Sequence, residues 1–193
     1  MTVEANMTFR LNQVLEAINK KQQEKEYLLV AIDGRCAAGK TTMASYLAKK
    51  LSCNCIHMDD FFLQPMQRTP KRLDEPGGNV DYERFLEEVL LPLSLRKSFS
   101  FRPFQCKTME FGEPISVELN SITIIEGSYA CHPQLIEYYD LRIFLSVDQT
   151  EQLRRIEKRN GMKAALMFFQ KWIPLEEKYI KAFQVPDHCD MAL

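Results

Sequence analysis

The sequence predicts an α/β fold in which a mostly parallel central sheet lies between two layers of helices. An unbroken aliphatic run at 28–32 and mainly apolar runs at 121–125 and 141–147 have the pattern of strands that are buried on both faces. Segments with apolar residues at helical spacing separate these runs. Alternation of strands with helices favours right-handed parallel crossovers, and therefore a three-layer sandwich.

The chain of 193 residues is long enough for one well-buried domain with a small insertion. We expect a single domain over residues 1–193, which begins with a leader helix at about 1–26. A substrate-side insertion is expected at about 63–118, and a helical lid at about 150–162. The leader has apolar residues at helical spacing and a charged end, KKQQEKE, and we assign it no chemistry.

The composition argues against several classes of partner. Lysine plus arginine (25) nearly balances aspartate plus glutamate (26), so no net charge favours nucleic acid or an anionic membrane. No stretch could span a bilayer, and the N-terminal MTVEANMTFR lacks the apolar core of a signal peptide. Six scattered cysteines without a C-x-x-C pair favour reduced thiols. We therefore expect a cytoplasmic protein with a small-molecule partner, and we leave homo-oligomerisation open.

A glycine-rich loop follows the first predicted strand. Gly34, Gly39, Lys40 and Thr41 fit the pattern G-x-x-x-x-G-K-[ST], and apolar residues at helical spacing follow over 43–51. This motif indicates a phosphate-binding loop, or P-loop, only when a strand precedes it and a helix follows, and both conditions hold here. The alternative is a turn rich in glycine and alanine before an ordinary helix, which the flanking elements disfavour.

The loop residues suit a nucleoside triphosphate such as ATP, together with Mg²⁺. Glycine backbone angles let successive N–H groups turn towards phosphate oxygens, and the helix N-terminus adds partial positive charge. Lys40 can reach the terminal phosphates, and the Thr41 hydroxyl can ligate Mg²⁺. The predicted nucleotide-binding residues of the loop are Gly34, Arg35, Cys36, Ala37, Ala38, Gly39, Lys40, Thr41 and Thr42.

Two carboxylates leave the second predicted strand, at 53–58. Asp59 and Asp60 follow it directly, and ligands of open α/β sheets lie beyond the carboxyl ends of the strands. A helix cap or a turn built from aspartate is the alternative. Beside a P-loop we favour a functional role, in which one of the two takes or orients the proton of an acceptor hydroxyl.

The third buried strand ends at Glu126, which Gly127 follows. An acidic residue at this position holds Mg²⁺, often through water, in P-loop enzymes. Glutamate stands here instead of the more usual aspartate, and a solvated strand end is the alternative. We therefore predict Thr41 and Glu126 as the metal ligands.

The insertion combines a long loop with short strands. Residues 63–80 contain three prolines and a Gly–Gly pair, and loops of this length are typical of lids and binding loops. Asp81 is expected to cap the next helix, which Pro92 ends or kinks. Partial alternation at 99–107 and 109–117 predicts short antiparallel strands that project over the substrate side.

Residues 151–160 read as a basic helix, with arginine at 154, 155 and 159. Such a run is often just a solvated face, but phosphoryl transfer needs arginines to offset the charge on the transferring group. Gly161 follows as a helix stop and hinge, which favours a lid.

The last part of the chain is predicted to be mostly helical. Over 162–183 the pattern is helical, with a break expected at Pro174. The lone Trp172 is expected in the core, where its neighbours would be Leu166, Phe169, Leu175 and Tyr179. Residues 189–193 resemble the start of a final strand.

Together these motifs resemble the uridine kinase-like group of P-loop nucleoside kinases, which also includes phosphoribulokinase and bacterial pantothenate kinase. The resemblance runs from about residue 27 to the C-terminus. It rests on GRCAAGKT, HMDDFF, DEPGGNVDYERF, IIEGSY, and DLRIFLSVD followed by QLRRIEKRNG. It implies a three-layer P-loop kinase fold, MgATP as the phosphoryl donor, and the primary hydroxyl of a nucleoside as the acceptor.

The resemblance also implies roles for individual side chains. Asp59 matches the general base that takes the proton of the acceptor hydroxyl, and Lys40 is the second implied catalytic residue. Asp74 matches the acid that grips the sugar hydroxyls, and Glu126 matches the glutamate near Mg²⁺. The remaining implied contacts are Arg155 and Arg159 to the phosphates, and Phe61 and Tyr129 to the substrate.

The chain departs from uridine kinases inside the insertion. Where they have a Tyr–Asp–Phe segment and then a base-recognising histidine, this chain has Arg102-Pro103-Phe104 and then Cys106-Lys107. Cationic Arg102 and Lys107 over the pocket suit an acceptor with negative charge or several hydroxyls. A phosphorylated sugar or a pantothenate-like alcohol is therefore an alternative acceptor. A nucleotide-dependent regulatory ATPase without an acceptor is an alternative of a different class.

Overall fold

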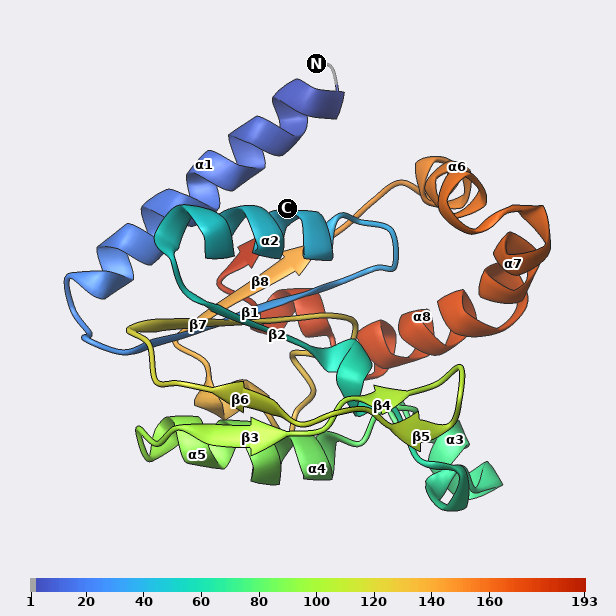
Figure 1. The fold of residues 1–193 in the computed structure, drawn as a ribbon. Coiled ribbons are helices and arrows are strands. Elements are labelled where there is room, and N and C mark those ends of the chain that lie inside the picture. Colours follow the sequence, from blue (N-terminus) through green and yellow to red (C-terminus); the bar gives the residue numbers. More distant parts are fainter. Residues whose placement is uncertain (1–2) are drawn as a thin grey trace.

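A five-stranded parallel sheet forms the centre of the computed structural model, which describes residues 3–193 (Figure 1). All neighbouring strands in it are parallel. This confirms the predicted α/β class. In spatial order, the strands are β2 (Asn54–His57), β7 (Ile122–Glu126), β1 (Leu28–Gly34), β8 (Leu141–Leu145) and β9 (Met191–Ala192).

Helices cover both faces of the sheet and complete the three layers (Figure 1). On one face, α1 (Val3–Gln22) and α2 (Lys40–Leu51) bury apolar side chains such as Val14 and Met43 against the strands. On the other face, Phe85 of α4 (Tyr82–Phe85) shares a core with residues of α5 (Leu91–Ser94) and α8 (Ile173–Ala182). No helix among residues 3–193 is long and apolar enough to cross a membrane. Residues 1 and 2 of the predicted leader lie outside the described residues.

Two helices continue through prolines that were expected to interrupt them. A π-helical turn, Leu86–Leu90, joins α4 to α5 ahead of Pro92. A second π-helical turn, Phe168–Trp172, joins α7 (Met162–Met167) to α8 ahead of Pro174. Proline clashes with the carbonyl four residues earlier in a regular helix, and a wider turn relieves that clash. The break predicted at Pro174 is therefore wrong.

The insertion packs below the sheet (Figure 1), and its Asp74 forms an ion pair with Lys178 of α8. Its strands form two antiparallel pairs, as predicted. β3 (Phe99–Phe101) pairs with β6 (Ile115–Val117), and β4 (Phe104–Gln105) pairs with β5 (Glu110–Phe111). The other elements are α6 (Gln149–Asn160), α3 (Pro70–Asp74) and 3₁₀ turns at Met58–Phe61, Pro65–Gln67, Ile136–Tyr138 and Val185–His188.

A buried carboxylate at the end of β1 ties three segments together. Asp33, only 1% exposed, accepts hydrogen bonds from the backbone N–H of Gly34 (2.6 Å), Tyr129 (3.2 Å) and Cys131 (2.9 Å). The hydroxyl of Tyr179 in α8 donates a fourth, at 2.8 Å. Asp33 therefore fixes the start of the P-loop, the loop after β7 and α8 relative to one another.

Replacement of Asp33 is expected to destabilise the whole domain. Asp33→Ala leaves three buried N–H groups and one hydroxyl without their acceptor, which should lower the free energy of unfolding by about 3 kcal/mol or more. Urea unfolding followed by circular dichroism measures this. Asp187→Ala, at an exposed aspartate, is the control and should change the value by less than about 0.5 kcal/mol. Equal effects of the two variants would contradict the anchoring role.

Candidate functional site

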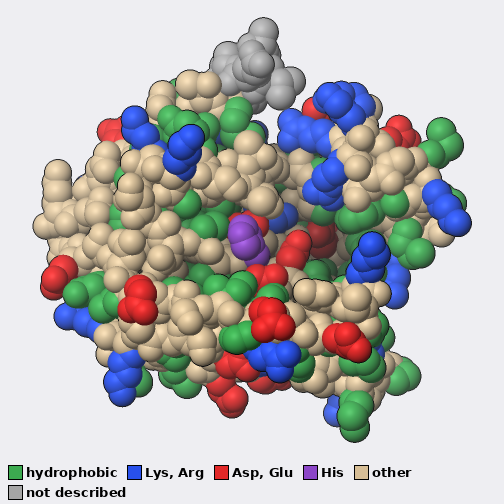
Figure 2. Space-filling model, in the orientation of Figure 1, with side chains coloured by type: hydrophobic (Ala, Val, Ile, Leu, Met, Phe, Trp, Pro, Cys, Tyr) green, Lys and Arg blue, Asp and Glu red, His purple; other side chains and the backbone are tan. Residues whose placement is uncertain are grey.

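A cavity of about 1150 Å³ opens between the P-loop, the insertion and helices α6 to α8. The space-filling view shows a hollow at this position, with acidic side chains and a histidine inside it and lysine or arginine side chains on its upper rim (Figure 2). The carboxyl ends of β1, β2 and β7 all meet this cavity. It therefore lies where an open parallel sheet binds ligands.

The P-loop presents unpaired donors to the cavity. Gly34 has φ +138°, and a Cβ there would lie 2.0 Å from the carbonyl oxygen of Leu145, so only glycine fits. Ala37 and Gly39 take left-handed backbone angles, with φ 58° and 102°. Within the described residues, the N–H groups of Ala37, Gly39 and Lys40 have no hydrogen-bond acceptor. This concave set of donors lies at the N-terminus of α2, which suits an anion.

Lys40 is folded back onto its own loop. Its side chain is buried, and Nζ donates to the carbonyl oxygens of Gly34 (2.6 Å) and Arg35 (3.0 Å). Ser128 Oγ lies 3.2 Å from the same ammonium group. These neutral partners hold the charge at the cavity without neutralising it, so the ammonium group can exchange them for phosphate oxygens.

Thr41 and Glu126 lie together at the floor of the cavity. Thr41 Oγ1 is 3.2 Å from Glu126 Oε1, because β7 ends beside the first turn of α2. The parallel register pairs His57 with Glu126, and His57 Nδ1 lies 2.6 Å from the same carboxylate. This hydrogen bond raises the pKa of His57, although burial opposes it. A hydroxyl and a carboxylate side by side form a suitable oxygen set for Mg²⁺.

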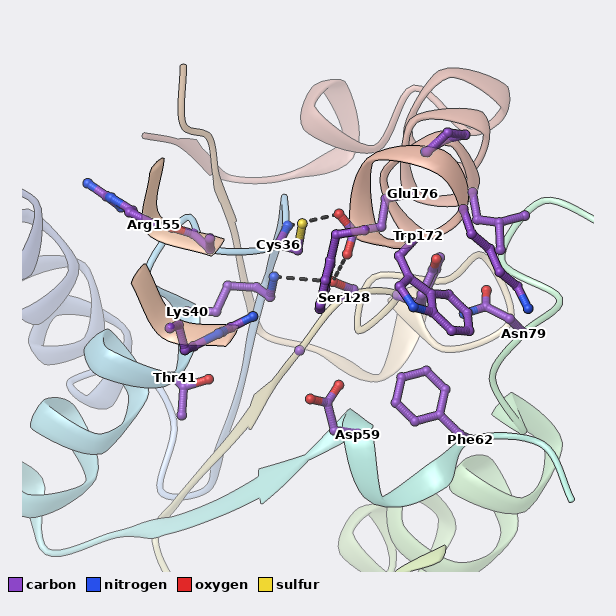
Figure 3. Close-up of a pocket in the computed structure, with 18 of the residues that line it drawn as sticks. Cys36, Lys40, Thr41, Asp59, Phe62, Asn79, Ser128, Arg155, Trp172 and Glu176 are labelled. Carbon is purple, nitrogen blue, oxygen red and sulfur yellow. Dashed lines mark hydrogen bonds between the residues drawn. The ribbon is translucent and has the colours of Figure 1, made fainter. Parts of the chain in front are cut away.

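Asp59 faces this floor from the end of β2 (Figure 3). Its side chain reaches solvent through the cavity and lines the wall opposite Lys40 and Thr41. Desolvation by the surrounding protein raises the pKa of Asp59, and the nearby carboxylate of Glu126 raises it further. The positive charge of Lys40 lowers this pKa. A carboxylate with a raised pKa, beside the anion loop, is well suited to exchange a proton with a ligand.

The two predicted lid arginines line the cavity from α6. Arg155 Nη1 donates to the carbonyl oxygen of Ala37 at 3.0 Å, and its Nε binds Glu151. Arg159 binds the side chain of Asn160 and lies over the ring of Phe168. Of the predicted loop residues, those that line the cavity are Cys36, Ala37, Gly39, Lys40, Thr41 and Thr42, whereas Gly34, Arg35 and Ala38 lie behind them.

The substrate contact predicted at Phe61 is wrong. Phe61 is fully buried, packs against Phe85 and Phe101, and carries the guanidinium group of Arg84 over its ring. The 3₁₀ turn Met58–Phe61 points this ring into the core, and the next ring, Phe62, lines the cavity instead. Tyr129, also predicted to contact the substrate, lines the cavity, although only 2% of it is exposed.

Asp74 and Arg102 do not line the cavity either. The side chain of Asp74 is 85% exposed and forms an ion pair with Lys178 at 2.6 Å, which lowers the pKa of Asp74. Arg102 turns outward, and its Nε donates to the carbonyl oxygen of Gly112 at 2.8 Å. The backbone of the β4–β5 hairpin thereby holds Arg102 away from the cavity. Lys107 does not line the cavity either.

Trp172 lies at the cavity wall rather than in the core. In the close-up it stands above Phe62, with Asn79 beside it (Figure 3). Its expected core neighbours Leu166 and Phe169 are 56% and 51% exposed. The π-helical turn explains the error, because its extra residue shifts the apolar face out of the regular helical phase.

Glu176 is a cavity residue that the sequence analysis missed. It is 7% exposed, and its Oε2 accepts the N–H of Cys36 in the P-loop at 2.8 Å. Its Oε1 accepts the hydroxyl of Ser128 at 2.7 Å (Figure 3). The next residue, Glu177, binds Arg35 through two hydrogen bonds of 2.5 and 3.0 Å. The sequence did contain a signal for this role. Glu176 lies three positions before the buried Tyr179, and therefore on the same face of the helix.

Comparisons with known proteins support the fold. No protein-family model and no curated protein matches the sequence. A possible uridine kinase from Bacillus stearothermophilus is similar over 100% of both chains, with 16% identity and a TM-score of 0.73. A candidate fructose transport system kinase from Silicibacter sp. TM1040 covers 100% of this chain and 99% of its own, with 23% identity and a TM-score of 0.72.

A third similar structure is D-glycerate 3-kinase from Cryptococcus neoformans var. grubii. The match covers 89% of this chain and 87% of that one, with 14% identity and a TM-score of 0.60. At these identities the likeness concerns architecture alone. The chain therefore has the α/β fold of P-loop kinases.

Proposed function

We propose that the protein is an ATP-dependent kinase that transfers the γ-phosphoryl group to a hydroxyl of a small molecule. The observation that carries this proposal is the placement of Asp59, whose carboxylate faces the P-loop lysine across one shared cavity (Figure 3). A triphosphate seated in the loop would direct its terminal phosphate into that gap. An alcohol in the same gap would have its hydroxyl beside the carboxylate.

The residues present fit MgATP. The free N–H groups of Ala37, Gly39 and Lys40 and the N-terminus of α2 would hold the phosphates. Thr41 and Glu126 would hold Mg²⁺, which neutralises charge on the phosphate oxygens when it is bound. Arg155, which already contacts the loop, is close enough to offset charge on the transferring group.

Asp59 then acts as the general base. Its carboxylate orients the acceptor hydroxyl and takes its proton as the oxygen attacks phosphorus. Its raised pKa suits this step, since a stronger base removes a proton more readily at neutral pH. Tyr129, Phe62 and Trp172 enclose the acceptor half of the cavity, and closure of this half would exclude water as a competing acceptor.

The sequence resemblance makes a nucleoside the first acceptor to test. The names of the three similar structures refer to uridine, fructose and D-glycerate, all of which carry hydroxyl groups. A coupled assay of ADP release, with and without a panel of alcohols, tests the proposal. Acceptor-dependent ADP release is expected. A rate that ignores every acceptor would favour the regulatory ATPase.

Asp59→Asn should remove most of the transfer activity. The amide keeps the size of the side chain but cannot take a proton, so turnover should fall about 10²- to 10⁴-fold. The affinity for MgATP, measured by calorimetry, should stay within about twofold, because Asp59 does not contact the P-loop. Asp60→Asn is the matched control and should retain most of the activity. Full activity in Asp59→Asn would remove the base assignment.

Glu176→Gln should strengthen the binding of MgATP. The carboxylate lies at the P-loop N–H of Cys36, where it repels phosphate, and glutamine keeps an oxygen acceptor while it removes the charge. Removal of one negative charge beside the phosphate-binding loop is expected to lower the dissociation constant of MgATP about three- to tenfold. Calorimetry with MgATP measures the effect. Glu87→Gln, an equal charge change at an exposed site, should leave the constant unchanged. Weaker binding in Glu176→Gln would contradict this electrostatic account.

A further inference from the structure

The insertion side of the cavity contains an arginine without an acidic partner. Arg68 is half-buried, lines the cavity, and follows the 3₁₀ turn Pro65–Gln67. Its Nε donates to the carbonyl oxygen of Leu63 at 2.9 Å, and its Nη2 lies 3.7 Å from Cys106 Sγ. Within the described residues, Nη1 has no hydrogen-bond partner, and no carboxylate pairs with this guanidinium group.

Among the described residues, no acid that lines the cavity forms an ion pair with Arg68, and all of these acids except Asp59 have other partners. Glu126 contacts Thr41 and His57, and Glu176 contacts the P-loop. Glu151 binds arginines of its own helix, α6. A ligand anion would therefore meet no carboxylate that is already paired with Arg68.

Arg68 lies on the acceptor side of Asp59. Its backbone anchor, Leu63, comes shortly after Asp59 on the same wall, and its second contact, Cys106, belongs to the β4–β5 hairpin of the insertion. The P-loop contributes the opposite wall (Figure 3). A molecule that places a hydroxyl at Asp59 can therefore extend away from the nucleotide and towards Arg68.

Besides the arginines of α6, two lysines line this cavity from the π-helical turn Phe168–Trp172 and from α8. Lys171 lies over the ring of Trp172, and Lys178 is paired with Asp74 at the outer edge. Both are cations, so neither can form an ion pair with Arg68. Arg102 and Lys107 were the cations expected over the pocket, but Arg68 is the insertion cation that lines it.

We propose that the acceptor is an anionic alcohol, whose carboxylate or phosphate group pairs with Arg68 while its hydroxyl reaches Asp59. This inference rests on the proposed kinase function and adds the chemical class of the acceptor. A guanidinium group binds either anion with two parallel hydrogen bonds, and the half-buried setting strengthens them relative to open solvent. One such charged contact favours an anionic acceptor over its neutral analogue by about tenfold or more.

Paired compounds test the proposal directly. Glycerate is compared with glycerol, and ribose 5-phosphate with ribose; uridine is included as a neutral nucleoside. A saturating non-hydrolysable MgATP analogue fills the P-loop, so that the anions cannot bind there. The chain has one tryptophan, and Trp172 lines the cavity, so its fluorescence reports binding. Coupled ADP release with MgATP gives the KM of the same compounds.

The anionic member of at least one pair should bind about tenfold more tightly than its neutral partner. Arg68→Gln should abolish this preference and raise the KM for the anion, while the KM for MgATP stays unchanged. Arg96→Gln, at an exposed arginine stacked on Tyr27, removes the same charge and should keep the preference.

Three results would overturn the proposal. They are equal binding of neutral and anionic partners, no binding of any anion, and an unchanged preference in Arg68→Gln. If Arg68 only secures the Leu63 loop, Arg68→Gln would weaken neutral and anionic compounds alike, which also counts against the proposal. An anion preference that persists without ADP release from any acceptor would instead reject the kinase function and leave the anion site standing.

Discussion

The geometry of the site depends on one buried carboxylate. Asp33 accepts four hydrogen bonds, from the first residue of the P-loop, from the loop that follows Glu126, and from α8. Burial raises the pKa of Asp33, and these hydrogen bonds lower it, so they stabilise a charge that the interior disfavours. The phosphate loop, the floor of the cavity and the wall that carries Glu176 take their relative positions from this residue.

The P-loop is also held from the helical side. Gln152 in α6 donates to the carbonyl oxygen of Cys36 at 3.0 Å, and Arg155 donates to that of Ala37. From α8, Glu176 accepts the N–H of Cys36. The loop therefore has both a carbonyl and an N–H group engaged on the side of α6 and α8, while within the described residues the N–H groups of Ala37, Gly39 and Lys40 stay free on the cavity side. Its shape is preorganised before any anion arrives.

Much of the fold could be predicted from the sequence, because local pattern determines it. Aliphatic runs specified the strands of the parallel sheet, and the glycines of the P-loop motif matched real backbone requirements at Gly34 and Gly39. Asp59 and Glu126 could also be placed, since both follow buried strands whose carboxyl ends share one edge.

The insertion side of the cavity could not be predicted in the same way. Which of the adjacent rings Phe61 and Phe62 faces the cavity depends on a 3₁₀ turn that periodicity does not reveal. The place of Trp172 depends on a π-helical turn. Arg102 points outward because it donates a hydrogen bond to a backbone carbonyl beside the hairpin. Tertiary contacts decide all three, whereas the nucleotide side is set by short-range chemistry.

Helix α8 touches both halves of the cavity with neighbouring residues. Glu176 and Glu177 bind the P-loop, and Lys178 binds Asp74 in the insertion. A rigid movement of this helix would therefore change contacts in both halves. Thermodynamic linkage makes such coupling reciprocal: if the donor nucleotide changes the affinity for the acceptor, the acceptor changes the affinity for the nucleotide by the same factor. In the proposed kinase, α8 would thus be the element through which the two ligands could affect each other's binding.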